Sequence, residues 1–133
     1  MMIHFTKYYK YQLAETYVVR TSIRPAEDIE TFFVSLSKDG VLTIRRGYAW
    51  DGPSGPTFDT SNFMRGSLVH DSIYQLLSQN RLPDKFRGPA DYLLRTICIE
   101  DGMSDFRAWY VWKAVRRFGR VPAGTPKEIL TAP

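Results

Sequence analysis

The hydrophobic pattern of the chain changes period once. From residue 5 to 50, apolar residues alternate with polar ones or cluster in short runs rich in Tyr, Val, Phe, Ile and Thr, which favours strands. From 61 to 119 they recur every three or four residues, as in helices. Between these regions, "DGPSGPTFDT" (51–60) holds two Gly and two Pro and predicts a rigid loop. We therefore expect one α+β domain over residues 1–133, with a small antiparallel N-terminal β-sheet followed by about three helices and an irregular tail (120–133).

Four short antiparallel strands, forming one small sheet, are expected in the first region. Two of them lie in "YKYQL" and "TYVVRTSI". The other two lie in "TFFVSLSKDGVLTIRRGYAW", on either side of Asp39-Gly40. This dipeptide supplies the positive φ angles of a tight turn, so it predicts a β-hairpin.

The first helix is expected to begin at a capping residue, Thr60 or Ser61, and to run to about Gln79. Its apolar positions follow the helical period and predict a buried face. They are Phe63, Leu68, Val69, Ile73, Leu76 and Leu77.

Two further helices are expected after the turn "NRLPDKFRGP". The second, "ADYLLRTICIED", has Pro89 in its first turn and ends at Gly102. The third, "DFRAWYVWKAVRRF", is capped by Ser104 and closed by Gly119.

Composition limits the class of protein. No run of about 18 apolar residues occurs, so we expect no transmembrane segment. The N-terminus "MMIHFTKYYKYQ" lacks the apolar core of a signal peptide, so we do not expect Sec-dependent secretion. Cys98 is the single cysteine, which fits a reducing compartment, and its apolar neighbours predict a buried small hydrophobe.

The net charge of +4 is unevenly distributed. Residues 1–60 hold seven basic and seven acidic residues, whereas residues 61–133 hold eleven and seven. The simpler explanation is that basic residues near the end of the last helix complement its dipole and favour solubility. The alternative is an anionic partner, of which a phospholipid surface is expected rather than nucleic acid.

The first helix carries polar groups where apolar ones would pack at less cost. The chain has two histidines, and one of them, His70, shares a helix face with Tyr74. A short connection favours antiparallel helices, so we expect Asp91 at the start of the second helix to approach His70. A carboxylate bound to one ring nitrogen fixes the tautomer and leaves the other nitrogen to take a proton from water.

Asp71 would then point towards the Gly/Pro loop. A carboxylate and backbone carbonyls from a rigid loop are oxygen donors that suit Ca²⁺, and no thiolate or histidine pair is available for a softer ion. The sequence therefore suggests a Ca²⁺ site with Asp71 as one ligand. Its other candidate ligands lie in the loop: Asp51, Gly52, Ser54 and Gly55.

A second interpretation of the same residues involves no catalysis. A histidine, an aspartate and a tyrosine within five residues can form a satisfied hydrogen-bond cluster that ties the loop to the helices. The protein would then be a structural or accessory protein.

Residues of about 45–120 resemble an uncharacterised family encoded in phages and prophages, domain of unknown function 1353. The resemblance rests on four motifs: Asp51-Gly52-Pro53-Ser54, His70-Asp71 with Tyr74, Ala90-Asp91, and Trp109 with Trp112. It implies a phage- or prophage-encoded protein that acts in the host cytoplasm during infection or is incorporated in the virion, where other virion proteins would be its partners. The family implies no established activity.

The order of loop, His-Asp-x-x-Tyr and Ala-Asp is also locally similar to that of secretory-type phospholipases A(2), including the disulfide-free viral enzymes. This similarity implies that His70 is a general base, that Asp71 binds Ca²⁺ and that Asp91 orients His70. Tyr74 would support Asp91, and carbonyls of residues 52–55 would complete the metal shell. The implied activity is Ca²⁺-assisted hydrolysis of ester or lipid bonds.

Overall fold

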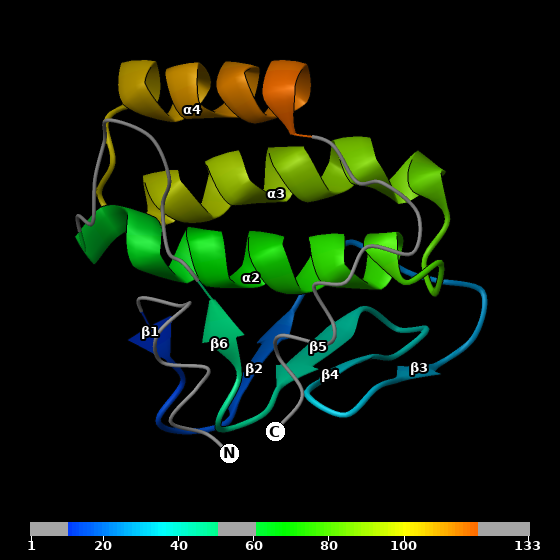
Figure 1. The fold of residues 1–133 in the computed structure, drawn as a ribbon. Coiled ribbons are helices and arrows are strands. Elements are labelled where there is room, and N and C mark those ends of the chain that lie inside the picture. Colours follow the sequence, from blue (N-terminus) through cyan, green and yellow to red (C-terminus); the bar gives the residue numbers. More distant parts are fainter. Residues whose placement is uncertain (1–10, 51–60, 120–133) are drawn as a thin grey trace.

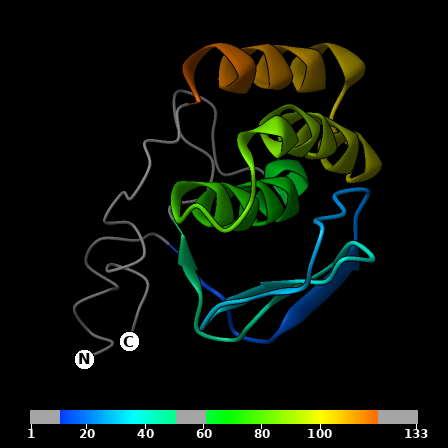
Figure 2. The same cartoon turned by 90° about the vertical axis from the view of Figure 1, so that its right-hand side faces the viewer.

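The structure is a computed structural model that describes residues 11–50 and 61–119, and it confirms the α+β class (Figure 1). A β-layer is covered by α2, α2 is covered by α3, and α4 lies outermost (Figure 1, Figure 2). The three α-helices of the described residues run in alternating directions (Figure 1). They span Ser61–Ser78 (α2), Arg87–Glu100 (α3) and Asp105–Phe118 (α4), with a 3-10 turn, η1, over Asp84–Phe86.

The β-layer differs from the expected single four-stranded sheet. The described residues form six short strands in two sheets, ordered β2-β5-β4-β3 and β1-β6, and all pairs are antiparallel. The strands are β1 Tyr11–Gln12, β2 Tyr17–Arg20, β3 Ile29–Glu30, β4 Val34–Leu36, β5 Val41–Ile44 and β6 Ala49–Trp50. Three of them contain two residues each, too few to produce a period, so only tertiary pairing defines them.

The predicted hairpin joins β4 and β5, but its turn has one positive φ angle instead of two. Gly40 has φ +93°, while Asp39 keeps a negative φ. The amide of Gly40 donates to the Ser37 carbonyl, and the amide of Ser37 donates to the Val41 carbonyl. This is a turn followed by a one-residue bulge, a common three-residue hairpin connection.

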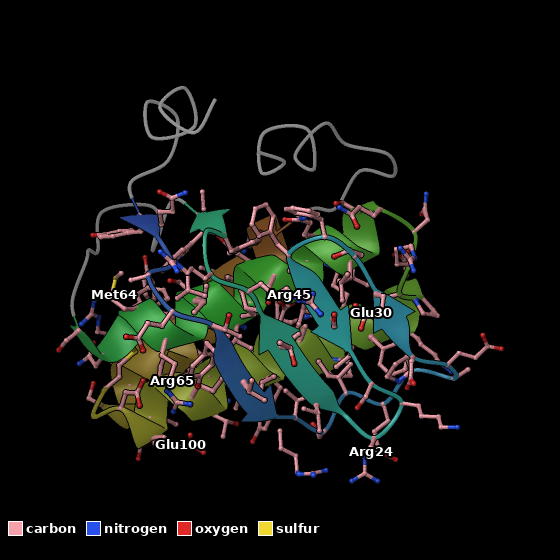
Figure 3. All side chains as sticks on the ribbon, turned by 90° about the horizontal axis from the view of Figure 1, so that it is seen from below. Arg24, Glu30, Arg45, Met64, Arg65 and Glu100 are labelled. Carbon is pink, nitrogen blue, oxygen red and sulfur yellow. The ribbon has the colours of Figure 1, made fainter. Side chains whose placement is uncertain are left out.

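The core lies between the inner face of the four-stranded sheet and α2. Paired residues on neighbouring strands, Leu36 with Leu42 and Val34 with Ile44, are fully buried. All six apolar residues predicted to form the buried face of α2 are buried, so that prediction is confirmed. The outer face of the sheet carries polar residues beside the exposed Val18, and there Arg45 and Glu30 form an ion pair of 3.2 Å (Figure 3).

The helix α2 is buried on most of its circumference because it lies between the sheet and α3. Its polar residues therefore need internal partners. The hydroxyls of Ser67, Ser72 and Ser78 each donate to the carbonyl three residues earlier, at 2.8–2.9 Å. Serine is small, and its hydroxyl here needs no partner outside the helix. These residues therefore allow close packing on both sides of α2.

Helix ends agree with the sequence prediction in part. The hydroxyl of Ser104 accepts from the Arg107 amide at 3.2 Å, so the predicted N-cap of α4 is confirmed. Gly102 closes α3 with φ +101°. The helix α3 begins at Arg87, three residues before the expected start, because η1 leads directly into it and Pro89 is accommodated in the first turn.

Arg65 connects three elements at one end of the helical layers. Its guanidinium donates to Glu100 at 2.8 Å, to Asp101 at 3.0 Å and to the Tyr17 hydroxyl at 3.0 Å. The bond to Asp101 is the main reason that the pKa of Arg65 is raised. Arg65 and Glu100 lie close together at this end of α2 and α3 (Figure 3).

Cys98 is fully buried, as predicted, and burial together with the nearby Asp101 charge raises the pKa of its thiol to about 12. In the part of the chain that the structure describes, no helix is both long and apolar enough to cross a bilayer. The predicted loop 51–60 and tail 120–133 lie outside the described residues.

Two glycines with positive φ allow a test of the hairpin geometry. A Cβ at Gly40 would lie 2.4 Å from the Thr21 carbonyl oxygen, whereas a Cβ at Gly102 would have no neighbour within 4 Å. Gly102→Ala should cost about 1–2 kcal/mol of unfolding free energy from backbone strain alone. Gly40→Ala should cost clearly more in urea unfolding, and equal losses would contradict the described contact with Thr21.

Candidate functional site

The predicted approach of Asp91 to His70 is confirmed. His70 lies in the middle of α2 and Asp91 lies in the second turn of α3, which runs antiparallel to α2. The distance from His70 Nε2 to Asp91 Oδ1 is 2.6 Å. Asp91 is 0% exposed and His70 is 7% exposed, so the contact lies between the two helices and not on their surface.

Tyr74 binds the same carboxylate oxygen. Its hydroxyl donates to Asp91 Oδ1 at 2.6 Å. One turn apart on α2, the rings of His70 and Tyr74 lie against each other, with centroids 4.1 Å apart and planes tilted by 35°. The phenol thus supports both the orientation of the imidazole and the position of the carboxylate.

The structure adds two arginines that the sequence prediction did not include. Arg116 of α4 donates from Nη1 to Asp91 Oδ2 at 2.8 Å. Arg87, the first residue of α3, donates from Nε to the Tyr74 hydroxyl at 3.2 Å and from Nη2 to the carbonyls of Arg116 and Gly119. A carboxylate that is buried between helices needs a positively charged partner. An aspartate predicted at a buried helix position therefore indicates that a basic residue from another part of the chain contacts it.

Gly119 follows the last residue of α4 at a position that has no room for a side chain. Its φ of −71° is available to any residue, so it is not the left-handed cap typical of glycine. A Cβ at this position would lie 2.6 Å from the Val115 carbonyl oxygen and 3.1 Å from the Tyr74 hydroxyl. The absence of a side chain therefore lets the end of α4 approach the site.

Asp91 is held in its ionised form. Burial alone would raise the pKa of its carboxyl, but the hydrogen bonds from His70 and Tyr74 and the charge of Arg116 outweigh this effect and lower the pKa. The pKa of Tyr74 is shifted in the opposite direction. Burial and the adjacent Asp91 carboxylate raise the pKa of the phenol, which therefore remains a donor.

These protonation states define the tautomer of His70. An ionised carboxylate only accepts hydrogen bonds, so Nε2 of His70 must carry the proton in its contact with Asp91. In the neutral imidazole, Nδ1 then has a free lone pair. No described residue donates a hydrogen bond to Nδ1, so the nitrogen can act as a base towards a molecule that reaches it.

The Ca²⁺ site expected from the sequence lies mostly outside the described residues. Asp71 is half-buried on α2 beside His70, whereas the candidate ligands Asp51, Gly52, Ser54 and Gly55 all belong to 51–60. Within 11–50 and 61–119, no group of three or more His, Cys, Asp or Glu side chains is arranged to hold a metal ion.

The end of β6, directly before the loop, is held against α2. Trp50, the last described residue before the loop, donates from its indole to the Ser67 hydroxyl at 3.1 Å. Ser67 lies one turn before His70 on the same helix face. The described chain before residue 51 therefore ends at a strand whose last side chain contacts the helical turn that precedes His70.

Comparison of the chain with protein-family profiles, with curated proteins and with solved structures finds no match. The interpretation of the site therefore depends on its geometry and chemistry.

The protonation of Asp91 predicts how stability depends on pH. Asp91→Asn leaves Arg116 without its anion, although the arginine side chain is 36% exposed and water reduces the loss. We expect a decrease in unfolding free energy of about 2–4 kcal/mol at pH 7. Because the folded-state pKa is below the ordinary value of 3.8, this difference should be complete above about pH 5 and shrink as the pH falls through the folded-state pKa.

The matched control is Glu27→Gln, which changes an exposed carboxylate and should have little effect at any pH. Urea unfolding of the wild type and both variants at several pH values provides the measurement. A difference for Asp91→Asn that grows towards acid pH would contradict the assignment of an ionised Asp91.

Proposed function

We propose that this protein is a phage- or prophage-encoded hydrolase that cleaves ester or lipid bonds with the assistance of Ca²⁺, and that His70 is its general base. The observation that carries the proposal is the 2.6 Å contact of His70 Nε2 with the buried Asp91 carboxylate. This contact leaves Nδ1 as the basic nitrogen. The His-Asp-x-x-Tyr order and the resemblance to phospholipases A(2) support the same assignment.

In this mechanism Nδ1 of His70 takes a proton from a water molecule while the water oxygen attacks the carbonyl carbon of the ester. The imidazole becomes positively charged, and the Asp91 carboxylate stabilises that charge. When the carbon–oxygen bond to the leaving group breaks, His70 returns the proton to the departing oxygen. Tyr74 and Arg116 keep Asp91 in place throughout.

The donor set proposed for the metal is chemically suited to Ca²⁺. Asp71 supplies a carboxylate next to the base, and the Trp50–Ser67 contact holds the end of β6, directly before residue 51, against α2. Asp51 and the carbonyls of Gly52, Ser54 and Gly55 would supply the other oxygens. When bound, Ca²⁺ would polarise the ester carbonyl and stabilise the negative charge that develops on its oxygen.

A second candidate function is that of a non-catalytic virion or accessory protein in which the cluster is structural. The observation that favours it is the pair of arginines. Arg116 binds Asp91, and Arg87 binds both Tyr74 and the C-terminal carbonyls of α4, so the cluster joins all three helices. Such bonds stabilise a fold whether or not the histidine reacts.

Two substitutions at His70 separate these functions. His70→Gln keeps an N–H donor for Asp91 but has no basic nitrogen, whereas His70→Ala removes both. If His70 is the base, both variants should lose at least 100-fold in the rate of ester or phospholipid hydrolysis. His70→Ala should also lose about 1–3 kcal/mol of unfolding free energy because it leaves Asp91 without a donor, and His70→Gln should recover most of this loss.

Hydrolysis is measured with a soluble short-chain ester and with phospholipid, and stability with thermal and urea unfolding. Retained hydrolysis in His70→Gln would exclude His70 as the base. If the wild type hydrolyses neither substrate in millimolar Ca²⁺ while His70→Ala is destabilised, the structural function replaces the catalytic one.

Ca²⁺ binding can be measured separately from hydrolysis, through the melting temperature of the protein. A cation that binds only the folded protein raises the melting temperature by mass action. Millimolar Ca²⁺ should raise it by several degrees in the wild type, more than Mg²⁺ does, and should have little effect on Asp71→Asn. An unchanged melting temperature, or the same shift in Asp71→Asn, would contradict the assignment of Asp71 as a ligand.

A further inference from the structure

The outer face of α4 carries exposed aromatic and basic side chains. α4 is the outermost helix, and its apolar residues Ala108 and Val111 pack towards α3 (Figure 1, Figure 2). The opposite face is formed by five residues at i, i+3, i+4, i+7 and i+11, which share one side of a helix. These residues, called the α4 stripe below, are Phe106, Trp109, Tyr110, Lys113 and Arg117, and all are exposed.

The exposure of the aromatic residues requires an explanation. Phe106 is 74% exposed, Tyr110 is 54% exposed and Trp109 is 40% exposed, although α4 already has a buried face that packs on α3. Large aromatic side chains contribute most to stability when they are buried. A contiguous exposed group of them is typical of an interaction surface.

Cations accompany these rings. Lys113 Nζ lies 5.5 Å from the Trp109 ring centroid, and the rings of Phe106 and Trp109 lie 6.1 Å apart. Arg95 of α3 lies 5.4 Å from the ring of Trp112 and extends the same chemistry onto the neighbouring helix. After Asp105 the helix sequence contains no acidic residue. The surface is therefore apolar and positively charged at once.

We propose that the α4 stripe binds an anionic phospholipid surface, with the helix lying in the plane of the interface. A helix with aromatic residues flanked by lysine and arginine on one face is suited to the boundary between lipid head groups and acyl chains. A helix of 14 residues is about 21 Å long, which is enough to place three rings in that boundary.

Charge complementarity selects this occupant over two others. A second copy docked symmetrically on the same face would bring Lys113 and its neighbouring cations together, which is unfavourable. Single-stranded nucleic acid is bound in positively charged grooves that follow its backbone, whereas the α4 stripe is the convex side of one helix and holds three rings for two cations. An anionic bilayer offers an apolar boundary region to the aromatic rings and negatively charged head groups to the cations.

The stripe also lies close to the candidate site. Arg117 is its last residue, and the preceding Arg116 donates to Asp91. The proposal deepens the proposed function, on which it rests for the identity of the substrate, because a lipid hydrolase must meet its substrate at an interface. Binding itself depends on α4 and not on His70.

The experiment measures partition of the protein onto vesicles in EDTA, so that neither Ca²⁺ nor turnover contributes. Vesicles of phosphatidylcholine alone are compared with vesicles that also contain phosphatidylglycerol. The wild type should bind the anionic vesicles much more tightly, with a blue shift of its tryptophan fluorescence. Phe106→Ala/Trp109→Ala should lose at least tenfold in partition coefficient, and Arg95→Gln/Lys113→Gln should lose about 30-fold.

Matched controls lie in the β-layer. Phe32 is 70% exposed, almost as much as Phe106, so Phe32→Ala removes a comparable exposed ring from another surface. Arg24→Gln/Lys38→Gln removes the same charge from two exposed strand connections (Figure 3 labels Arg24). Both controls should bind anionic vesicles like the wild type.

Three results would overturn the proposal: equal binding to neutral and anionic vesicles, equal losses in the controls, or wild-type binding by Phe106→Ala/Trp109→Ala and Arg95→Gln/Lys113→Gln. A dimer that dissociates on Phe106→Ala would assign the stripe to a second copy. Tighter binding of a single-stranded oligonucleotide, lost on Arg95→Gln/Lys113→Gln, would assign it to nucleic acid.

The two proposals can fail separately. His70→Gln should bind anionic vesicles like the wild type. Vesicle binding without any hydrolysis would count against the proposed hydrolase alone. Hydrolysis of a soluble ester without vesicle binding would count against the α4 stripe alone.

Discussion

Asp91 is fully buried, and the packing of the three helices depends on how its charge is compensated. The carboxylate accepts from His70 and Tyr74 of α2 and from Arg116 of α4. An ionised carboxylate without such partners would cost several kcal/mol in this environment. Four groups are therefore fixed relative to one another, although α2 and α4 are separated by α3.

The opposite end of the helical layers shows what a purely structural charge cluster looks like in this fold. Arg65 joins α2 to Glu100 and Asp101 at the end of α3. Glu100 and Asp101 both accept from the Arg65 guanidinium, which has no basic nitrogen. At Asp91, in contrast, one bond is made by an imidazole, which retains a second nitrogen of different chemistry. This difference is the physical basis for proposing a reaction at the Asp91 cluster and not at the Arg65 cluster.

Much of this arrangement could be predicted from the sequence because it depends on local patterns. The period change, the hairpin at Gly40, the Ser104 cap and the approach of His70 to Asp91 follow from spacing and turn chemistry. The division of the β-layer into two sheets could not be predicted, because two-residue strands have no period. Arg87 was not predicted to join the site, since the direction of a long side chain depends on tertiary packing.

The proposed role of His70 as a base depends most directly on the tautomer of its ring. Long-range ¹H–¹⁵N correlation NMR distinguishes the two ring nitrogens, and the only other histidine in the chain is His4, which a substitution identifies. We expect the neutral ring of His70 to carry its proton on Nε2 and to show an unprotonated Nδ1, and Asp91→Asn to weaken this preference. A neutral ring protonated on Nδ1 would contradict both the Asp91 contact and the role of His70 as a base.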